Sequence, residues 1–228
     1  TFIFESLGAL ILTVRFYPQM GFKDGLFNGI FHSVSAICNA GFDLMGKYGQ
    51  FSSMTAYASD VVVNITIMSL IVTGGIGFVA WDDLANNHFS FKKYQLHTKI
   101  VLVTTAALIL GCAAIFFTTE GNHSMAGMNT KERILASLFQ SVTPRTAGFN
   151  TIAQDKLTEG GSLLTMILMV VGGSPGSTAG GIKTTTLVTL LLGAWSTARQ
   201  NSDISIYKRR LETDSLKKAS AITVIYVS

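Results

Sequence analysis

The most informative stretch of this sequence occurs twice. The first copy is Phe31-His32-Ser33-Val34-Ser35 followed by Ala40-Gly41-Phe42-Asp43, and the second is Phe139-Gln140-Ser141-Val142-Thr143 followed by Ala147-Gly148-Phe149-Asn150. The first halves match at an offset of 108 residues and the second halves at 107, and further on Gly74-Gly75-Ile76 matches Gly180-Gly181-Ile182 at 106. Three matching blocks in the same order indicate a duplicated unit of roughly 107 residues.

The composition is that of an integral membrane protein. Of the 228 residues, 48% are apolar and 13% are charged, and the mean hydropathy is +0.43. Apolar runs long enough to cross a bilayer, which takes about 20 helical residues, occur at 61–81 and 100–118, and a third at 163–192 is interrupted by glycines. Shorter apolar runs, 2–16 and 219–227, lie at the two ends. We therefore expect the sequence to be part of a longer protein.

The sequence contains no pattern typical of an enzyme or of a resident metal site. Its four histidines are scattered, and its two cysteines are too few for a disulfide framework. No nucleophile is paired with a base, and no two carboxylates share a predicted span. We therefore expect no catalytic residues and no cofactor in this chain, and nothing in it indicates a nucleic acid as partner.

The distribution of positive charge predicts the topology. Lys and Arg gather in two places, with Lys92, Lys93 and Lys99 in the first and Arg199, Lys208, Arg209, Arg210, Lys217 and Lys218 in the second. Cytoplasmic loops carry the excess of positive charge, so both places are expected inside, and residues 17–60 and 119–159 outside. Each repeat then consists of an outward helix, a re-entrant segment and an inward helix. The run at 208–210 is expected to anchor this topology and to contact anionic lipid.

Each external segment contains an apolar stretch too short to span the membrane, at 25–37 and at 133–142, directly before the Ala-Gly-Phe block. A half-length helix that dips into the membrane and returns fits that length, and irregular backbone at such depth is tolerated where protein or a wet cavity surrounds it. The carbonyls after such a helix can replace the water around a cation. The pattern therefore predicts a filter for a dehydrated monovalent cation.

Glycine suits such a filter because it reaches backbone angles closed to other residues, so Gly41 and Gly148 can turn their carbonyls toward a pore axis. The stretch 146–150 keeps the Thr, the central Gly and the aromatic of the potassium-channel pattern Thr-Val-Gly-Tyr-Gly, and the stretch that begins at 39 keeps the Gly and the aromatic. The candidate residues that bind K+ through backbone carbonyls are Asn39, Ala40, Gly41, Phe42, Thr146, Ala147, Gly148 and Phe149.

A glycine-rich stretch interrupts the last complete apolar run. It consists of Gly172, Gly173, Ser174, Pro175, Gly176, Ser177, Thr178, Ala179, Gly180, Gly181, Ile182 and Lys183. So many glycines with a proline cannot hold a continuous helix, so we expect a mobile loop. Lys183 is costly at membrane depth. We expect it to hold the pore closed or to tether the loop to a carbonyl; the alternative is that it lies near the inner interface and extends its amine to water.

The same residues nearly match the nucleotide-binding loop Gly-x-x-x-x-Gly-Lys-Ser/Thr. The match fails because Ile182 stands between Gly181 and Lys183, and because an apolar run of membrane length, rather than a β-strand, precedes it.

Two charged residues flank the candidate filter. Arg145 would oppose cation entry if it lined the entrance, so we expect it to face away and to brace the pore helix against Asp155, Glu159 or free carbonyls. Asp43 could raise the cation concentration at the mouth, or it could be an ordinary solvated carboxylate.

Together these motifs resemble the Trk/Ktr/HKT family of potassium transporters, and most of all the bacterial Ktr membrane subunit. The resemblance implies an all-α membrane protein with four repeats of helix, pore helix with re-entrant loop, and helix around one pore, as in a potassium channel. This chain would supply repeat two (1–81), a cytoplasmic linker (82–97), repeat three with a broken inner helix (98–198), and a linker with the start of repeat four (199–228).

The resemblance also implies a function and partners. It implies uptake of K+ across a bacterial cell membrane, with the glycine-rich stretch as a gate beneath the filter. It implies a homodimer on a cytosolic ring of regulatory subunits, to which the run at 208–210 would dock, and the nucleotide (ATP, ADP or NAD) is expected only on that ring. Relatives with Ser in place of one filter glycine tend to favour sodium, so Gly41 and Gly148 indicate potassium.

A secondary carrier that binds its solute at a broken helix in the membrane midplane is the alternative function. The interrupted run at 163–192 is the feature that supports it. Carrier repeats are often inverted, whereas the two repeats here are expected to run parallel, which favours a pore.

Overall fold

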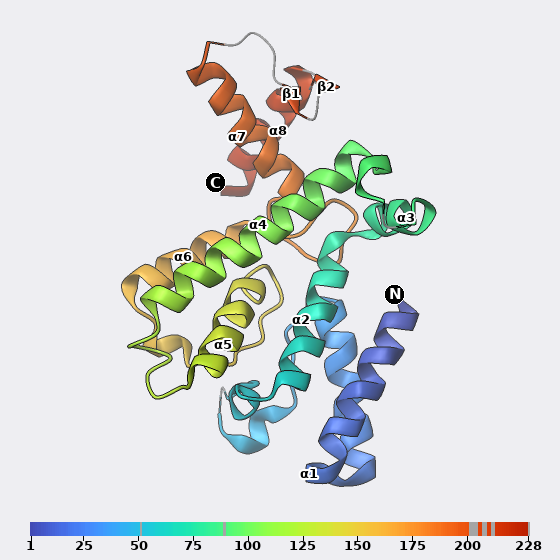
Figure 1. Ribbon diagram of the computed structural model, residues 1–228, viewed down its shortest axis with the longest axis vertical. Coiled ribbons are helices and arrows are strands. Elements are labelled where there is room, and N and C mark those ends of the chain that lie inside the picture. The colour runs from blue at the N-terminus through green and yellow to red at the C-terminus, as the bar shows by residue number, and fades with distance from the viewer. Residues whose placement is uncertain (51, 89, 201–204, 207–208, 211–212, 228) are drawn as a thin grey trace.

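The computed structural model describes residues 1–50, 52–88, 90–200, 205–206, 209–210 and 213–227. In these residues helices joined by turns and loops make up the chain, apart from one short ribbon of two strands (Figure 1). The helices are α1 (Phe2–Ile37), α2 (Val61–Ile76), α3 (Phe78–Asn86), α4 (Leu96–Thr119), α5 (Thr130–Val142), α6 (Glu159–Val170), α7 (Thr184–Ala198) and α8 (Thr213–Val227), and strand β1 (Ser205–Ile206) pairs antiparallel with β2 (Arg209–Arg210). Of the basic run at 208–210, Lys208 lies outside the described residues.

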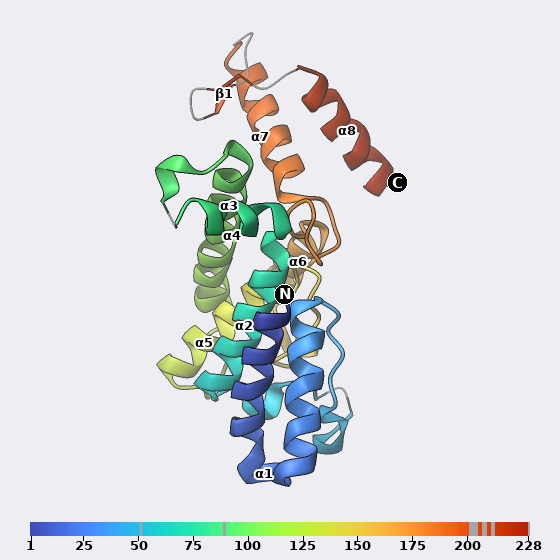
Figure 2. The same cartoon turned by 90° about the vertical axis from the view of Figure 1, so that its right-hand side faces the viewer.

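Helix α1 is a hairpin of two helices joined without a loop. Gly21 has φ 79° and ψ 174°, and there the chain reverses, so that the two arms lie side by side (Figure 2). Ser33 in the second arm donates a hydrogen bond of 2.7 Å to the Glu5 carbonyl in the first. A Cβ atom on Gly29 would lie 2.7 Å from the Thr13 nitrogen, so this glycine lets the arms approach closely. The second arm contains the short helix predicted at 25–37 and begins earlier than predicted.

The run predicted as one span at 61–81 is not one helix, so that prediction was wrong in its geometry. Helices α2 and α3 meet at 94°. Gly77, between them, has φ 89° and ψ 152°, and a Cβ atom there would lie 2.6 Å from the Ser174 hydroxyl oxygen. The bend therefore lies where the backbone of Gly77 packs directly against the glycine-rich stretch, with no room for a side chain.

Helix α4 is the one described helix that is long and apolar enough by itself to cross a membrane, and the bent pair α2 and α3 qualifies if it is counted as one span. Helix α6 is apolar but shorter. The run predicted at 163–192 is divided between α6 and α7 by the glycine-rich stretch, as the sequence indicates.

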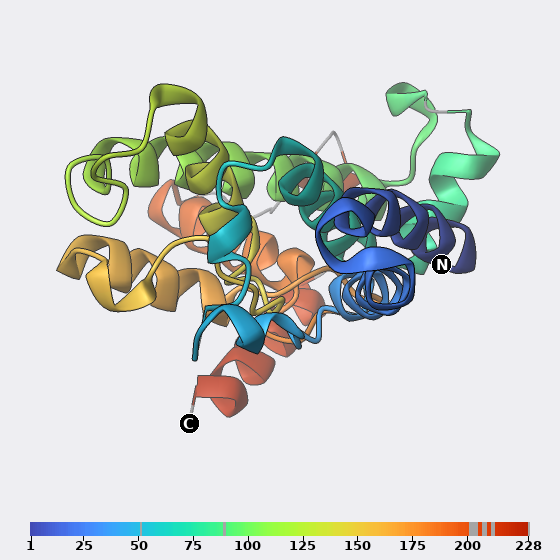
Figure 3. The same ribbon diagram turned by 90° about the horizontal axis from the view of Figure 1, so that it is seen from below.

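The main core lies where the two repeats meet. Leu12, Phe16 and Ile67 of the first repeat and Phe139 and Phe149 of the second are buried in one cluster. In a bilayer such contacts stabilise through close packing rather than through exclusion of water. We call the second arm of α1 and α5 the two pore helices. Seen from below, the segments that follow them and the glycine-rich stretch all lie near the centre, with helices around them (Figure 3).

Candidate functional site

The two Ala-Gly-Phe segments have matching backbone conformations. We call residues 39–42 filter segment one and residues 146–149 filter segment two. In segment one Asn39 has φ 51° and Gly41 has φ 71°, and in segment two Thr146 has φ 69° and Gly148 has φ 95°. The left-handed conformation expected at the two glycines is present, and each segment carries a second left-handed residue two positions earlier.

The last turn of each pore helix holds the end of its own segment. Ser35 donates a hydrogen bond of 2.7 Å to the carbonyl of Phe42, and Thr143 donates one of 2.5 Å to the carbonyl of Phe149. Because these equivalent bonds occupy the carbonyls of Phe42 and Phe149, the other carbonyls in the segments are more available to bind an ion.

Six carbonyls in the two segments accept no hydrogen bond from the part of the chain that the structure describes. They belong to Asn39, Ala40, Gly41, Thr146, Ala147 and Gly148. Asn39 and Ala147 are buried, Gly41 and Thr146 are half-buried, and Ala40 and Gly148 are exposed, so most of these free carbonyls belong to residues that solvent reaches. A cavity of about 420 Å³ borders segment two and reaches Ala40 of segment one.

The two segments touch each other at their glycines. A Cβ atom on Gly41 would lie 2.1 Å from the carbonyl oxygen of Ala147 and 2.9 Å from the Cα atom of Gly148. On Gly148, by contrast, an added Cβ atom would meet only the Cα atom of Gly41, at 3.3 Å. Absence of a side chain at Gly41 is therefore what permits the approach.

Residues 172–183, the glycine-rich loop from here on, contact both filter segments. Thr178 donates a hydrogen bond of 2.7 Å to the carbonyl of Ile37, and Asn39 Nδ2 donates one of 2.9 Å to Thr178 Oγ1. In segment two, the N–H of Gly180 donates to Thr146 Oγ1 at 3.1 Å. The equivalent positions Asn39 and Thr146 thus both bind the loop.

The glycine-rich loop also caps the C-terminal end of α2. The last carbonyls of a helix have no partner within the helix. Here the Gly74 carbonyl accepts from Thr178 N–H at 3.2 Å, the Gly75 carbonyl accepts from Ser174 N–H at 2.9 Å, and the Ile76 carbonyl accepts from the Ser174 hydroxyl. In the other direction the N–H of Phe78 donates to the Gly176 carbonyl at 3.0 Å.

Backbone hydrogen bonds join the two ends of the glycine-rich loop. The N–H of Gly172 donates to the Ile182 carbonyl at 3.0 Å, and the N–H of Ile182 donates to the Val170 carbonyl at 2.9 Å. A Cβ atom on Gly172 would overlap the Gly180 carbonyl oxygen. The loop is therefore a closed structure with glycine at its tightest point.

Both positive groups near the loop bind carbonyls. Lys183 Nζ donates to the Ala179 carbonyl at 2.8 Å, which is the tether to a loop carbonyl considered from the sequence. The buried Arg145 donates from Nη2 to the Gly172 carbonyl at 3.4 Å. The carboxylates of Asp155 and Glu159 are not its partners, so of the two kinds of partner expected for Arg145 the carbonyl is the one found. Asp43, for its part, accepts a hydrogen bond of 2.9 Å from the N–H of Met45 in its own turn.

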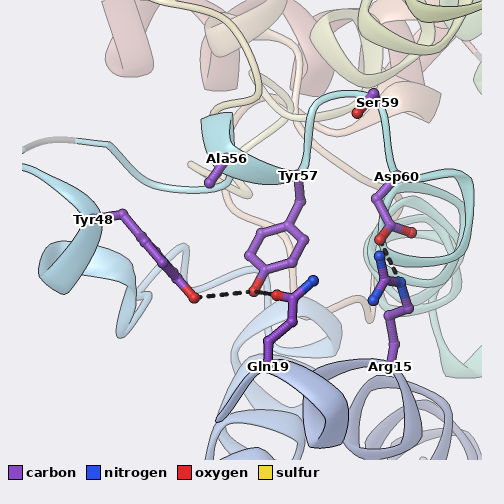
Figure 4. Close-up of a pocket in the computed structure, with 7 residues that line it drawn as sticks. All are labelled: Arg15, Gln19, Tyr48, Ala56, Tyr57, Ser59 and Asp60. Atoms are coloured by element: carbon purple, nitrogen blue, oxygen red, sulfur yellow. Dashed lines mark hydrogen bonds and ion pairs between the residues drawn. The ribbon is translucent and has the colours of Figure 1, made fainter.

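A polar pocket of about 430 Å³, which sequence reasoning missed, lies between α1 and the N-terminal end of α2 (Figure 4). Arg15 and Asp60 form an ion pair of 2.5 Å, and Asp60 Oδ1 also caps α2 by accepting from Val62 N–H and Val63 N–H. Tyr57 donates to Gln19 at 2.7 Å. Asp60 directly before an apolar run is the N-cap signature that could have predicted half of this arrangement.

The protonation of Tyr57 follows from its surroundings. Burial, and then the hydrogen bond with Tyr48, raise the pKa of the Tyr57 phenol above its ordinary value. It therefore keeps its proton at neutral pH and remains a donor to Gln19, which fixes the turn at Thr55–Tyr57 against α1.

No group of three His, Cys, Asp or Glu side chains in the described ranges is placed to hold a metal ion. The backbone oxygens of the two filter segments remain the candidate ligands for a cation that the sequence indicates.

Comparison with known proteins gives one family. The model of the TrkH family, described as cation transport protein, matches residues 1–227. The chain is similar to the potassium/sodium uptake protein NtpJ of Enterococcus hirae, with 37% identity over 227 residues that cover 99% of this chain and 49% of that protein. It is similar to the Ktr system potassium uptake protein B of Bacillus subtilis, with 37% identity over 222 residues that cover 96% of this chain and 48% of that protein.

A solved structure has the same fold. The crystal structure of the potassium transporter TrkH from Vibrio parahaemolyticus superposes with a TM-score of 0.74 at 21% identity, covering 96% of this chain and 46% of that one. The chain thus spans about half the length of the relatives it matches.

Proposed function

Because this chain belongs to the TrkH family of cation transport proteins, we propose that it is the central part of the pore-forming subunit of a bacterial potassium uptake system. The family consists of multi-pass membrane transporters rather than enzymes. In this proposal the chain supplies two pore repeats, and K+ is the transported ion rather than a cofactor.

The observation that carries the proposal is the row of six free carbonyls where filter segments one and two meet. Carbonyl oxygens can replace the hydration shell of a cation, and rings of such carbonyls select K+ over Na+ in potassium channels. The cavity of about 420 Å³ beside segment two lets an ion reach them. We propose that the remaining repeats of the full-length protein complete the ring of carbonyls.

The glycine-rich loop is proposed as the gate. It contacts both filter segments and the end of α2, so its position is linked to the filter. Lys183 and Arg145 are bound to loop carbonyls and add positive charge near the loop. A positive potential in this region opposes a passing cation, which fits a closed arrangement.

The proposed partners follow from the resemblance to Ktr systems. We propose a homodimer that rests on a cytosolic ring of nucleotide-binding subunits, with ATP, ADP or NAD bound to that ring. The basic run at 208–210 would contact the ring or anionic lipid.

The experiment that tests filter and gate is tracer uptake of K+ and Na+ into vesicles that carry the full-length parent protein. Deletion of residues 172–181 should raise K+ uptake, because it removes the loop beneath the filter. Gly148→Ser should lower the ratio of K+ to Na+ uptake while the protein still folds, because an added Cβ atom meets only Gly41 Cα at 3.3 Å.

The two variants test the filter and the gate separately. Unchanged selectivity in Gly148→Ser would contradict the filter assignment, and unchanged flux in the folded deletion variant would contradict the gate. Absence of uptake for both ions in the folded wild-type protein would favour a solute carrier instead.

A further inference from the structure

A small cavity beside Asn39 of filter segment one is lined by residues of both repeats. Its volume is about 10 Å³, and its walls include Asn39 of filter segment one, Thr105 of α4, Arg145 before filter segment two, and Gly173 and Ala179 of the glycine-rich loop. A volume of this size is at the lower limit for one water molecule. The cavity lies at the point where the filter, the loop and α4 meet.

Three side chains that line the cavity have a buried polar atom without a hydrogen-bond partner in the part of the chain that the structure describes. The atoms are Asn39 Oδ1, Thr105 Oγ1 and Arg145 Nε. The exposed fractions of these residues are 8%, 6% and 6%. An unpaired buried polar atom costs about 1–3 kcal/mol, so three at one cavity require an explanation.

The orientation of the Asn39 amide is fixed by its neighbours. Thr178 donates its only hydroxyl proton to the Ile37 carbonyl. The Asn39 atom that faces Thr178 Oγ1 must therefore be the donor Nδ2, at 2.9 Å. Consequently Oδ1 is the atom left without a partner, and it is an acceptor.

We infer that one water molecule is bound in this cavity and connects the two filter segments. It donates its two protons to Asn39 Oδ1 and Thr105 Oγ1 and accepts a hydrogen bond from Arg145 Nε. These three bonds are the usual number for a buried water. They satisfy all three unpaired atoms with one molecule.

Ions fit the cavity less well than water does. The Arg145 guanidinium repels a cation, and Asn39 Oδ1, which can only accept, repels an anion such as chloride. A neutral molecule that both donates and accepts matches the three partners.

The water site rests on the cavity and its three unpaired atoms, and its role in selectivity rests on the proposed filter. Through the water, Arg145 beside segment two is joined to Asn39 of segment one, which in turn holds Thr178 of the glycine-rich loop. Loss of the water should let the two segments move relative to each other and so weaken ion discrimination.

The test uses the full-length protein in lipid nanodiscs, with cryo-EM at a resolution that shows ordered waters, together with K+ and Na+ tracer uptake. Thr105→Val removes the hydroxyl at nearly constant volume, and Thr105→Ser restores it. Thr104→Val makes the same change on the same helix, at a residue that does not line the cavity. We expect density within hydrogen-bond distance of the three atoms in the wild type and in Thr105→Ser but not in Thr105→Val.

In uptake, Thr105→Val should lower the ratio of K+ to Na+ about fivefold, the size expected for one buried hydrogen bond, whereas Thr105→Ser and Thr104→Val should leave it unchanged. Absence of density in the wild type would overturn the water site. Density with an unchanged ratio in Thr105→Val, or an equal loss in Thr104→Val, would overturn the role in selectivity. If the folded wild type shows no selective uptake, the proposed function fails and the density alone decides the site.

Discussion

Filter segments one and two have the same backbone turn in different surroundings. Phe149 of segment two is fully buried in the core between the repeats, whereas Phe42 of segment one is 70% exposed. Both aromatic carbonyls nevertheless accept a hydrogen bond from the hydroxyl at the end of their own pore helix. The turn is therefore set by the local sequence, because it forms in the same way in both surroundings.

The inner helices differ more strongly. In the first repeat the helix breaks once, at Gly77, and continues at 94° as α3. In the second repeat the break widens into the glycine-rich loop between α6 and α7. The two breaks lie together, because the loop of the second repeat caps the helix of the first. The glycine-rich loop, which is present in the second repeat only, therefore also connects the two repeats.

The largest difference between the two filter segments is expected at their paired glycines. Gly41→Ala places a Cβ atom against the Ala147 carbonyl in a left-handed conformation, and overpacking together with strain should cost about 3 kcal/mol. Gly148→Ala adds mainly strain and should cost about 1 kcal/mol. Thermal unfolding of the two variants in the same detergent measures the difference, and equal losses would refute the asymmetry of the contact.

A smaller loss of stability is expected where the glycine-rich loop contacts filter segment one. Thr178→Val leaves the Ile37 carbonyl and Asn39 Nδ2 without their partner, which should cost about 2 kcal/mol and raise basal K+ flux. Ser177→Ala is the matched control, because Ser177 bonds only to Ser174 within the loop. Electrophysiology or tracer flux measures the change, and equal flux in the two variants would show that this contact does not restrain the loop.

The smallest loss of stability is expected at the hydrogen bonds that the pore helices donate to the two aromatic carbonyls. Thr143→Val leaves the buried Phe149 carbonyl without a donor, at a cost of about 1.5 kcal/mol. Ser35→Ala makes the same change at the exposed Phe42 and should cost about 0.5 kcal/mol, because water can replace the hydroxyl. Amide hydrogen exchange at the two pore-helix ends compares them, and a larger loss in Ser35→Ala would contradict the role assigned to burial.

Much of the fold could be predicted from the sequence, because the repeat, the apolar runs and the glycines are local signals. The pore helices, the left-handed Gly41 and Gly148, and the break after α6 follow from such signals. The bend at Gly77 could not be predicted, since α2 and α3 form one continuous apolar run. Ser174, which packs against Gly77, lies far along the chain.

The same limit applies to the site. The filter and loop residues could be nominated from the repeated motif, and their roles remain predictions. Their partners could not be nominated, because the contacts between Asn39 and Thr178 and between Arg145 and Gly172 join residues far apart in sequence. Carboxylates close to Arg145 in sequence were plausible partners, but three-dimensional proximity favoured a carbonyl.

The capping of α2 by the glycine-rich loop has an energetic consequence for the proposed gate. Four hydrogen bonds join the loop to the corner of α2 and α3, and each contributes about 1 kcal/mol net. Breaking them all costs about 4 kcal/mol, so the closed form would outnumber the open one about a thousandfold at rest. An activating partner must then bind the open form about a thousand times more tightly merely to equalise the two populations.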